Sequence, residues 1–138
     1  MKKILCVIII CCIASINSYS KAEIRLINYE ELNDNIFPNM ERPALIFFGR
    51  NNCPYVKKMV PIVNKLATNY ENSVDFYNVN GTSSANYEWL EELDIQGLPW
   101  IVIYYGPNRK AYSYFGGPNS YNDLAEALTE AITEWDKQ

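Results

Sequence analysis

The sequence predicts an α/β fold of one domain, a three-layer sandwich in which a mixed β-sheet carries helices on both faces. Three observations predict it. A continuous apolar run at residues 44–48 is typical of a buried central strand. A helical stripe of apolar side chains follows this run and begins at Val56. Further along the chain, two strand-like segments flank Gly106-Pro107-Asn108, which indicates an antiparallel hairpin.

The remaining elements follow from periodicity and from turn residues. Alternation of apolar and polar side chains indicates strands before and after the long helix, and Asn80-Gly81 ends the second of them. The order is β-α-β-α-β-α-β-β-α, with a parallel first part and the antiparallel hairpin near the end. We expect strands at 23–27, 44–48, 73–80, 100–105 and 109–115, and shorter helices at 28–36 and 83–93.

Two longer helices have clear apolar stripes. The first begins at Pro54, and Pro61 should kink it without ending it, since the stripe continues past this residue. The last helix opens with Ser120 and Asp123 in capping-box spacing. The first stripe consists of Val56, Met59, Val60, Val63, Leu66, Ala67 and Tyr70. The last stripe consists of Leu124, Ala127, Leu128, Ala131, Ile132 and Trp135, and in the helix at 83–93 Trp89, Leu90 and Leu93 should face inward.

The first twenty residues have the layout of a secretory signal peptide. Two lysines precede an apolar run from Ile4 to Ala14, and small and polar residues follow it. This run is short for a membrane span. We therefore expect cleavage after Ser20 and a domain at residues 21–138, with an uncleaved membrane anchor as the alternative. Cleavage would remove Cys6, Cys11 and Cys12 and leave Cys53 as the single cysteine.

Charge and composition exclude several classes of function. The whole chain carries a net charge of −4, and removal of the two N-terminal lysines would make it −6, which argues against nucleic acid as a partner. The chain has no histidine, so a Ser-His-Asp site and histidine metal ligands are excluded. No cofactor or metal site is predicted. The remaining groups for chemistry are a thiol, carboxylates, tyrosines and lysines.

Cys53 stands where a thiol is activated. The residue before a proline is pushed out of the helical conformation, and proline is favoured at the first helical position, so Cys53 should cap the helix that begins at Pro54. Free N–H groups and the helix dipole then favour the thiolate, as does Lys57 about one turn further on, and they lower the pKa of Cys53. A thiolate is the nucleophile of disulfide exchange. The alternative is a buried structural cysteine, but the tip of a strand–turn–helix unit is usually exposed.

A buried strand, a cysteine that opens a proline-containing helix and a later Gly-Leu-Pro before a strand resemble the thioredoxin family. The resemblance covers roughly residues 23 to 136. Its marks are Phe48, Cys53, Lys57, Pro61, Gly97, Pro99 and Gly116 or Gly117. It implies a thioredoxin-like fold.

The resemblance also implies how a client would bind. Pro99 would be cis and lie beside Cys53, and the backbone of Leu98, next to Gly97, would pair with an extended peptide. Tyr55 and Trp100 should flank Cys53 and form a peptide-binding surface. Pro54, Tyr55, Val56, Lys57 and Pro99 would then support the thiol, while Gly97, Leu98 and Trp100 would contact the client.

Several positions depart from the family pattern. The motif Cys-x-x-Cys is Cys53-Pro54-Tyr55-Val56 here, so the resolving cysteine maps onto Val56. The buried carboxylate of thioredoxin maps onto Phe47, and the tryptophan before the cysteine maps onto Asn52. Cys-Pro-Tyr also resembles monothiol glutaredoxins, which use glutathione in place of the second cysteine. A dithiol cycle within the chain is therefore not expected.

The leading functional hypothesis is an exported monothiol protein that exchanges disulfides with client thiols through mixed disulfides at Cys53. It would act as an oxidoreductase or isomerase without a resolving cysteine, with glutathione or a dithiol reductant as a possible second partner. The expected location is the periplasm, the extracellular space or a secretory lumen, with membrane contact only through an uncleaved signal segment. The alternatives are a non-catalytic binding module that uses the groove beside Cys53 and Pro99, and a covalent dimer through Cys53.

Overall fold

A computed structural model describes residues 24–106 and 112–138. The predicted signal peptide, its three cysteines, Pro107 and Asn108 of the hairpin turn and the first residues of the last predicted strand lie outside these residues. Within the described ranges, no helix combines the length and the apolar character that crossing a membrane requires.

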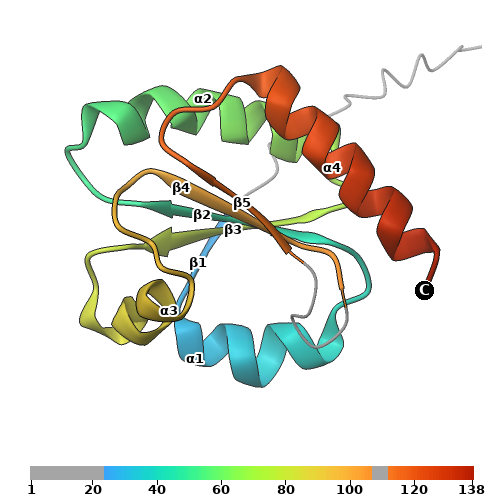
Figure 1. Ribbon diagram of the computed structural model, residues 1–138, viewed down its shortest axis with the longest axis horizontal. Helices are drawn as coiled ribbons and strands as arrows, with labels where there is room; N and C mark the ends of the chain where they lie inside the picture. The colour runs from blue at the N-terminus through green and yellow to red at the C-terminus, as the bar shows by residue number, and fades with distance from the viewer. Residues whose placement is uncertain (1–23, 107–111) are drawn as a thin grey trace, which may run out of the picture.

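One five-stranded sheet forms the middle layer, in the order β1-β3-β2-β4-β5 (Figure 1). β1, β3 and β2 are parallel, whereas β4 and β5 run antiparallel to their neighbours. The mixed sheet is therefore confirmed, with β2 at its centre and β1 and β5 at its edges. The strands are β1 (Arg25–Ile27), β2 (Ala44–Gly49), β3 (Asp75–Asn80), β4 (Trp100–Tyr104) and β5 (Tyr112–Gly116).

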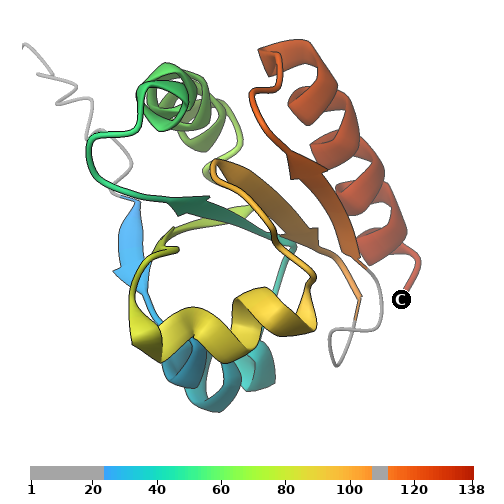
Figure 2. The same ribbon diagram turned by 60° about the vertical axis from the view of Figure 1, so that its left-hand side comes forward.

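Helices cover both faces of the sheet, as predicted (Figures 1 and 2). α2 (Pro54–Asn69) and α4 (Tyr121–Asp136) lie on one face. The other face carries two shorter helical segments. α1 (Tyr29–Glu31) continues into a π-helical turn (Leu32–Ile36) and a 3₁₀ turn (Phe37–Asn39), and a 3₁₀ turn (Ser84–Asn86) leads into α3 (Tyr87–Glu92).

Alternation along the strands divides the apolar side chains between two cores. On β2, Leu45 and Phe47 belong to the first core, under α2 and α4, whereas Ile46 and Phe48 belong to the second core, under α1 and α3. All four are buried. The continuous apolar run at 44–48 is thus explained, because a central strand with helices on both faces has no solvent-facing side.

α2 agrees with its predicted stripe except at one position. Val56, Met59, Val63, Leu66 and Ala67 are buried, and the helix continues through Pro61 to Asn69. Val60 was predicted to face inward, but it is 40% exposed. It faces the margin of the sheet near the short edge strand β1, where there is too little structure to cover it.

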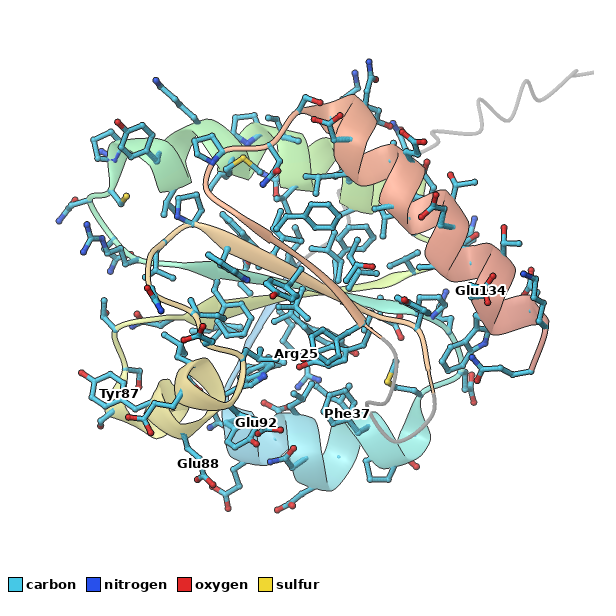
Figure 3. All side chains as sticks on the ribbon, in the orientation of Figure 1. Arg25, Phe37, Tyr87, Glu88, Glu92 and Glu134 are labelled. Carbon is cyan, nitrogen blue, oxygen red and sulfur yellow. The ribbon has the colours of Figure 1, made fainter. Side chains whose placement is uncertain are left out.

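The second core is built around aromatic rings. The ring of Trp89 packs edge-on against Phe48 at 4.7 Å and stacks on Tyr29 at 5.4 Å between centroids. Phe37 lies between its helical segment and the sheet (Figure 3), with its ring 4.9 Å from that of Tyr104. Trp89 and Leu93 are buried as predicted, while Leu90 is half-buried.

The helix starts follow their capping residues. The Ser120 Oγ accepts a hydrogen bond from the backbone N–H of Asp123 at 3.2 Å, so the predicted cap of α4 is confirmed. The Asn28 Oδ1 accepts from the backbone N–H of Glu31 at 2.8 Å and starts α1. This helical segment extends past the predicted end at residue 36 to Asn39, since the chain adds a π turn and a 3₁₀ turn before β2.

Candidate functional site

Cys53 is the N-cap residue of α2. Its backbone is extended, with φ −92° and ψ 121°, and Pro54 occupies the first turn. Asn52 before it is left-handed, with φ 60°. The carbonyl of Cys53 accepts the first helical hydrogen bond from the N–H of Lys57 at 3.0 Å. The predicted cap position is confirmed, and its cause is the conformational restriction that Pro54 imposes on the residue before it.

The surroundings of the sulfur favour the thiolate. The backbone N–H of Val56 is the strongest influence that lowers the pKa of Cys53, and burial opposes it. A hydrogen bond from the Arg50 side chain, the backbone N–H of Tyr55 and the charge of Arg50 lower this pKa further, so that it lies below its ordinary value. These N–H groups are the unpaired donors of a helix N-terminus, which stabilise an anion.

The charged group beside the thiol is Arg50, not Lys57. Lys57 was predicted to favour the thiolate, but it is exposed on α2 and is not among the groups that lower the pKa of Cys53. Sequence reasoning missed Arg50 as a functional residue. Its position three residues before Cys53, in the turn that joins β2 to α2, was the available signal, because short turns place such side chains close together.

Cys53 is less accessible than predicted. Only 4% of the residue is exposed, and it belongs to the first core. Its neighbours Pro54 and Tyr55 are exposed. The left-handed Asn52 turns the chain just before Cys53, so that the thiol packs against the core at the rim of the sheet. The sulfur therefore combines an activating environment with a restricted approach.

Apolar groups occupy the two positions where the family pattern has a second thiol and a carboxylate. Val56 is 7% exposed and Phe47 is 5% exposed, and both pack in the first core with Cys53. The predicted burial of Val56 is confirmed. Among the described residues, Cys53 is the one free cysteine. The same residues contain no group of three or more His, Cys, Asp or Glu side chains that could hold a metal ion.

The segment around Pro99 lies at the same end of the sheet as Cys53. β2 ends at Gly49 just before the turn to Cys53, and Phe48 pairs with Trp100 at the start of the antiparallel β4. The Leu98–Pro99 peptide bond is cis, which is the isomer that the family resemblance implies. The N–H of Gly117 donates to the Pro99 carbonyl at 3.0 Å.

Two predicted client contacts near Pro99 have different surroundings. Leu98 is half-buried and contacts both cores, and its side chain lies directly against Gly81. Gly97 is exposed, and a Cβ atom added to it would meet open space. This end of the sheet therefore brings Gly97 and Leu98 near the turn that carries Cys53.

Trp100 was predicted to flank Cys53, but the two residues pack in different cores. Trp100 packs with the second core, where its ring stacks on Tyr114 with 5.8 Å between centroids. Cys53 belongs to the first core on the other face. Side chains alternate along a strand, so when Ile101 faces the first core, Trp100 must face the second. Tyr55 is 55% exposed near the N-terminus of α2.

A groove that sequence reasoning did not predict lies beside the thiol. It has a volume of about 280 Å³ and runs between the first half of α2 and the sheet. We call it the Val60 groove. It is lined by Leu26, Phe47, Gly49, Arg50, Asn51, Val56, Val60, Asn78, Val79 and Asn80.

Comparisons with known proteins place this geometry in context. The family model named Thioredoxin matches residues 23–130. A mitochondrial thioredoxin domain-containing protein of Schizosaccharomyces pombe is 30% identical over 100 residues, which are 70% of this chain and 27% of that protein. The thioredoxin of Borreliella burgdorferi is 39% identical over 63 residues, which are 46% of this chain and 52% of that one. The chain thus spans about a quarter and about half of the length of these relatives.

Solved structures of thioredoxins have the same fold. Chloroplastic thioredoxin z has a TM-score of 0.69 at 18% identity, covering 80% of this chain and 96% of that chain. Thioredoxin from Trypanosoma brucei brucei has a TM-score of 0.67 at 19% identity, covering 82% and 94%. Thioredoxin f from spinach chloroplast has a TM-score of 0.67 at 22% identity, covering 80% and 94%. The predicted fold class is confirmed.

Proposed function

The chain belongs to the thioredoxin family, and on this premise we propose that it is an exported monothiol member that exchanges disulfides with client proteins through Cys53. The observation that carries the proposal is the position of this thiol. It lies at the N-terminus of α2, where backbone N–H groups and Arg50 lower its pKa, while Val56 occupies the place of a second cysteine. A stabilised thiolate without an internal partner is suited to forming mixed disulfides.

The proposed exchange has two steps. In the first, the Cys53 thiolate attacks one sulfur of a client disulfide, a new bond forms between the two sulfurs, and the other client sulfur leaves as a thiolate with the electron pair. In the second, another thiolate attacks the mixed disulfide and Cys53 is released as a thiolate. The attacking group is either a second thiol of the client, which gives isomerisation, or glutathione or a dithiol reductant, which gives net reduction.

The client is proposed to bind as an extended segment at the end of the sheet near Cys53. Gly97 is open to solvent, and Leu98 and Pro99 lie at the same end of the sheet as the turn that carries the thiol. Backbone pairing with an extended peptide would hold a client disulfide near the sulfur. Pro54 and Tyr55 are exposed beside it and would form the opposite side of the approach.

Export is proposed from residues 1–20, which have the composition of a secretory signal peptide. Cleavage after Ser20 would release a domain of residues 21–138 into the periplasm, the extracellular space or a secretory lumen. Such compartments contain the disulfide-bonded clients that the proposed exchange requires. Expression in a host cell followed by N-terminal sequencing of the exported protein tests this part directly.

The exchange is tested with the purified chain, a disulfide-bonded client protein and Cys53→Ser as the matched control. We expect a mixed disulfide that appears on a non-reducing gel with the parent chain only, and net reduction of the client that requires added glutathione or a dithiol reductant. Net reduction of the client without any external thiol would contradict the monothiol mechanism. A parent chain that forms no more mixed disulfide than Cys53→Ser would contradict the proposed function as a whole.

One observation favours a second candidate, a non-catalytic binding module that acts as a chaperone or assembly factor. Cys53 is only 4% exposed, so its sulfur has a restricted approach. In this case, a client would bind the surface beside Cys53 and Pro99 without covalent chemistry. Unchanged client binding by Cys53→Ser, together with an unreactive thiol in the parent chain, would assign the protein to this class.

A further inference from the structure

The Val60 groove exposes apolar side chains next to the thiol. Leu26 on β1, Asn78 on β3 and Phe47 on β2 are register partners and form one row across the sheet. Val56 and Val60, one helical turn apart, face this row from α2. Leu26 is 65% exposed and Val60 is 40% exposed. An apolar pair that remains open at a hollow of the surface is suited to a ligand side chain.

The charge of this groove contrasts with that of the whole protein. The chain has a net charge of −4. Among the described residues that line the groove, however, Arg50 is the one charged side chain, and Asn51, Asn78 and Asn80 supply amide groups. A single guanidinium at the end of an apolar hollow complements a group that combines an apolar body with a carboxylate.

The groove begins where the thiol is held. Arg50 and Val56 both line it, and the side chain of Arg50 and the backbone N–H of Val56 are also among the groups that lower the pKa of Cys53. A molecule joined to Cys53 therefore has the groove within reach of its next few atoms. This continuity links the hollow to the chemistry of the thiol.

We propose that the Val60 groove binds the part of a client peptide next to its disulfide-bonded cysteine, and selects segments that carry an apolar side chain and a carboxylate. This proposal rests on the proposed function. The apolar side chain would pack between Leu26 and Val60, and the carboxylate would pair with Arg50. The groove volume of about 280 Å³ is enough for one or two side chains. A stable contact with a second copy of the chain would instead bury about 800 Å² of surface on each partner.

The test uses short peptides whose single cysteine is activated as a mixed disulfide with thionitrobenzoate. The Cys53 thiolate attacks the peptide sulfur, the new disulfide forms, and thionitrobenzoate leaves with the electron pair as a coloured thiolate. Three peptides are compared in which the residues after cysteine include Leu and Glu, Leu and Lys, or Ser and Glu. We expect the Leu–Glu peptide to react about tenfold faster than the other two at subsaturating concentration, since each replacement removes one modest contact.

Substitutions in the groove should remove this preference without removing the thiol chemistry. Leu26→Ser and Val60→Ser change exposed apolar side chains, and both should bring the rates of the Leu–Glu and Ser–Glu peptides together. Tyr87→Ser is the matched control, because Tyr87 is 54% exposed on α3 and points away from the sheet (Figure 3). Equal rates for the three peptides with the parent chain would overturn the proposal.

A binding experiment separates the groove from the proposed function. Cys53→Ser in the full chain is titrated with fluorescent peptides in which cysteine is replaced by serine, and anisotropy is measured. We expect this protein to prefer the Leu–Glu peptide and to lose the preference when Val60→Ser is added. This result supports the groove even if Cys53 proves unreactive, because only the proposed function then fails. Absence of preference, or a dimer of the parent chain that Leu26→Ser dissociates, would overturn the assignment to a client peptide.

Discussion

The thiolate of Cys53 is stabilised by groups of two different kinds. The backbone N–H groups of Val56 and Tyr55 contribute because Cys53 caps a helix, and they would do so with other side chains at those positions. Arg50 contributes through its side chain. A substitution can therefore remove the second contribution and leave the first in place.

Arg50→Gln is expected to raise the pKa of Cys53 toward its ordinary value, because it removes a hydrogen bond and a positive charge from the thiolate. The pH dependence of alkylation by iodoacetamide reports this pKa, and its midpoint should move to higher pH. Lys57→Gln is the matched control and should leave the midpoint unchanged. Equal shifts in both variants would show that general charge, and not the contact with Arg50, determines the pKa.

Val56→Cys is expected to create a dithiol. Residues 53 and 56 are three apart at the start of a helix, so their side chains are neighbours. After oxidation, the variant should lose both reactive thiols to an internal disulfide. The reduced variant should reduce a client disulfide without glutathione, but slowly, since Phe47 leaves no carboxylate to move the proton. Thiol titration measures the first effect. Val60→Cys is the control: its introduced thiol lies too far along the helix from Cys53 to form a disulfide, so this variant should keep its two thiols.

At the scale of elements, the residues at which the helices begin agree best with the prediction from the sequence. α2 begins directly after Cys53 and α4 directly after Ser120, as the Cys-Pro pair and the capping box predict. The segment at residues 29–39 agrees less well, because its π and 3₁₀ turns have no distinct sequence signal. Local hydrogen bonds near a cap depend on two or three residues, whereas the end of an irregular helix depends on what it packs against.

Ser120→Ala is expected to lower the free energy of unfolding by about 1 kcal/mol, since it removes the oxygen that accepts from the N–H of Asp123. Urea denaturation followed by circular dichroism measures the change. Ser120→Asp supplies another acceptor at the N-cap and should retain most of the stability. A loss in the aspartate variant as large as in the alanine variant would contradict a capping role.

At the scale of the whole molecule, the sheet separates side chains that are close in sequence. Ile101 belongs to the first core with Cys53, while Trp100 packs with the second core. The sheet also creates the Val60 groove, because β1 pairs with β3 and leaves Leu26 at the edge beside α2. Neither relation can be found within one segment of the chain.

Stability should depend on pH through Cys53. The pKa of this thiol is lower in the folded protein than the ordinary value of a cysteine. As pH rises through the folded pKa toward the ordinary pKa of a cysteine, the folded state has lost the proton while the unfolded state still binds it, so the free energy of unfolding rises with pH. The contribution is lost as pH falls through the folded pKa.

The matched reference for this effect is Cys53→Ser, which has no thiol to titrate. Urea midpoints of both proteins are measured over a pH series that ends near 9. The difference between the parent chain and the variant should increase in favour of the parent as pH rises. A constant or decreasing difference would show that the thiol is not stabilised as an anion in the folded state.

Local chemistry by itself determined the central strand, the long helices, the capping role of Cys53 and the burial of Val56. These features depend on residues that are neighbours in the chain: an apolar run, a helical stripe, a cysteine before a proline. They could therefore be predicted from the sequence, and the sequence resemblance to thioredoxins extended the prediction to the fold.

Only the tertiary structure decided what surrounds the thiol. It placed Arg50 at the sulfur in place of Lys57, covered Cys53 almost completely, moved Trp100 to the opposite face and left Val60 open to solvent. The physical reason is that the direction of a side chain depends on strand register and on the turns between elements. A shift of one residue in the strand register, or one residue more or fewer in a turn, reverses the face of the sheet on which a side chain lies.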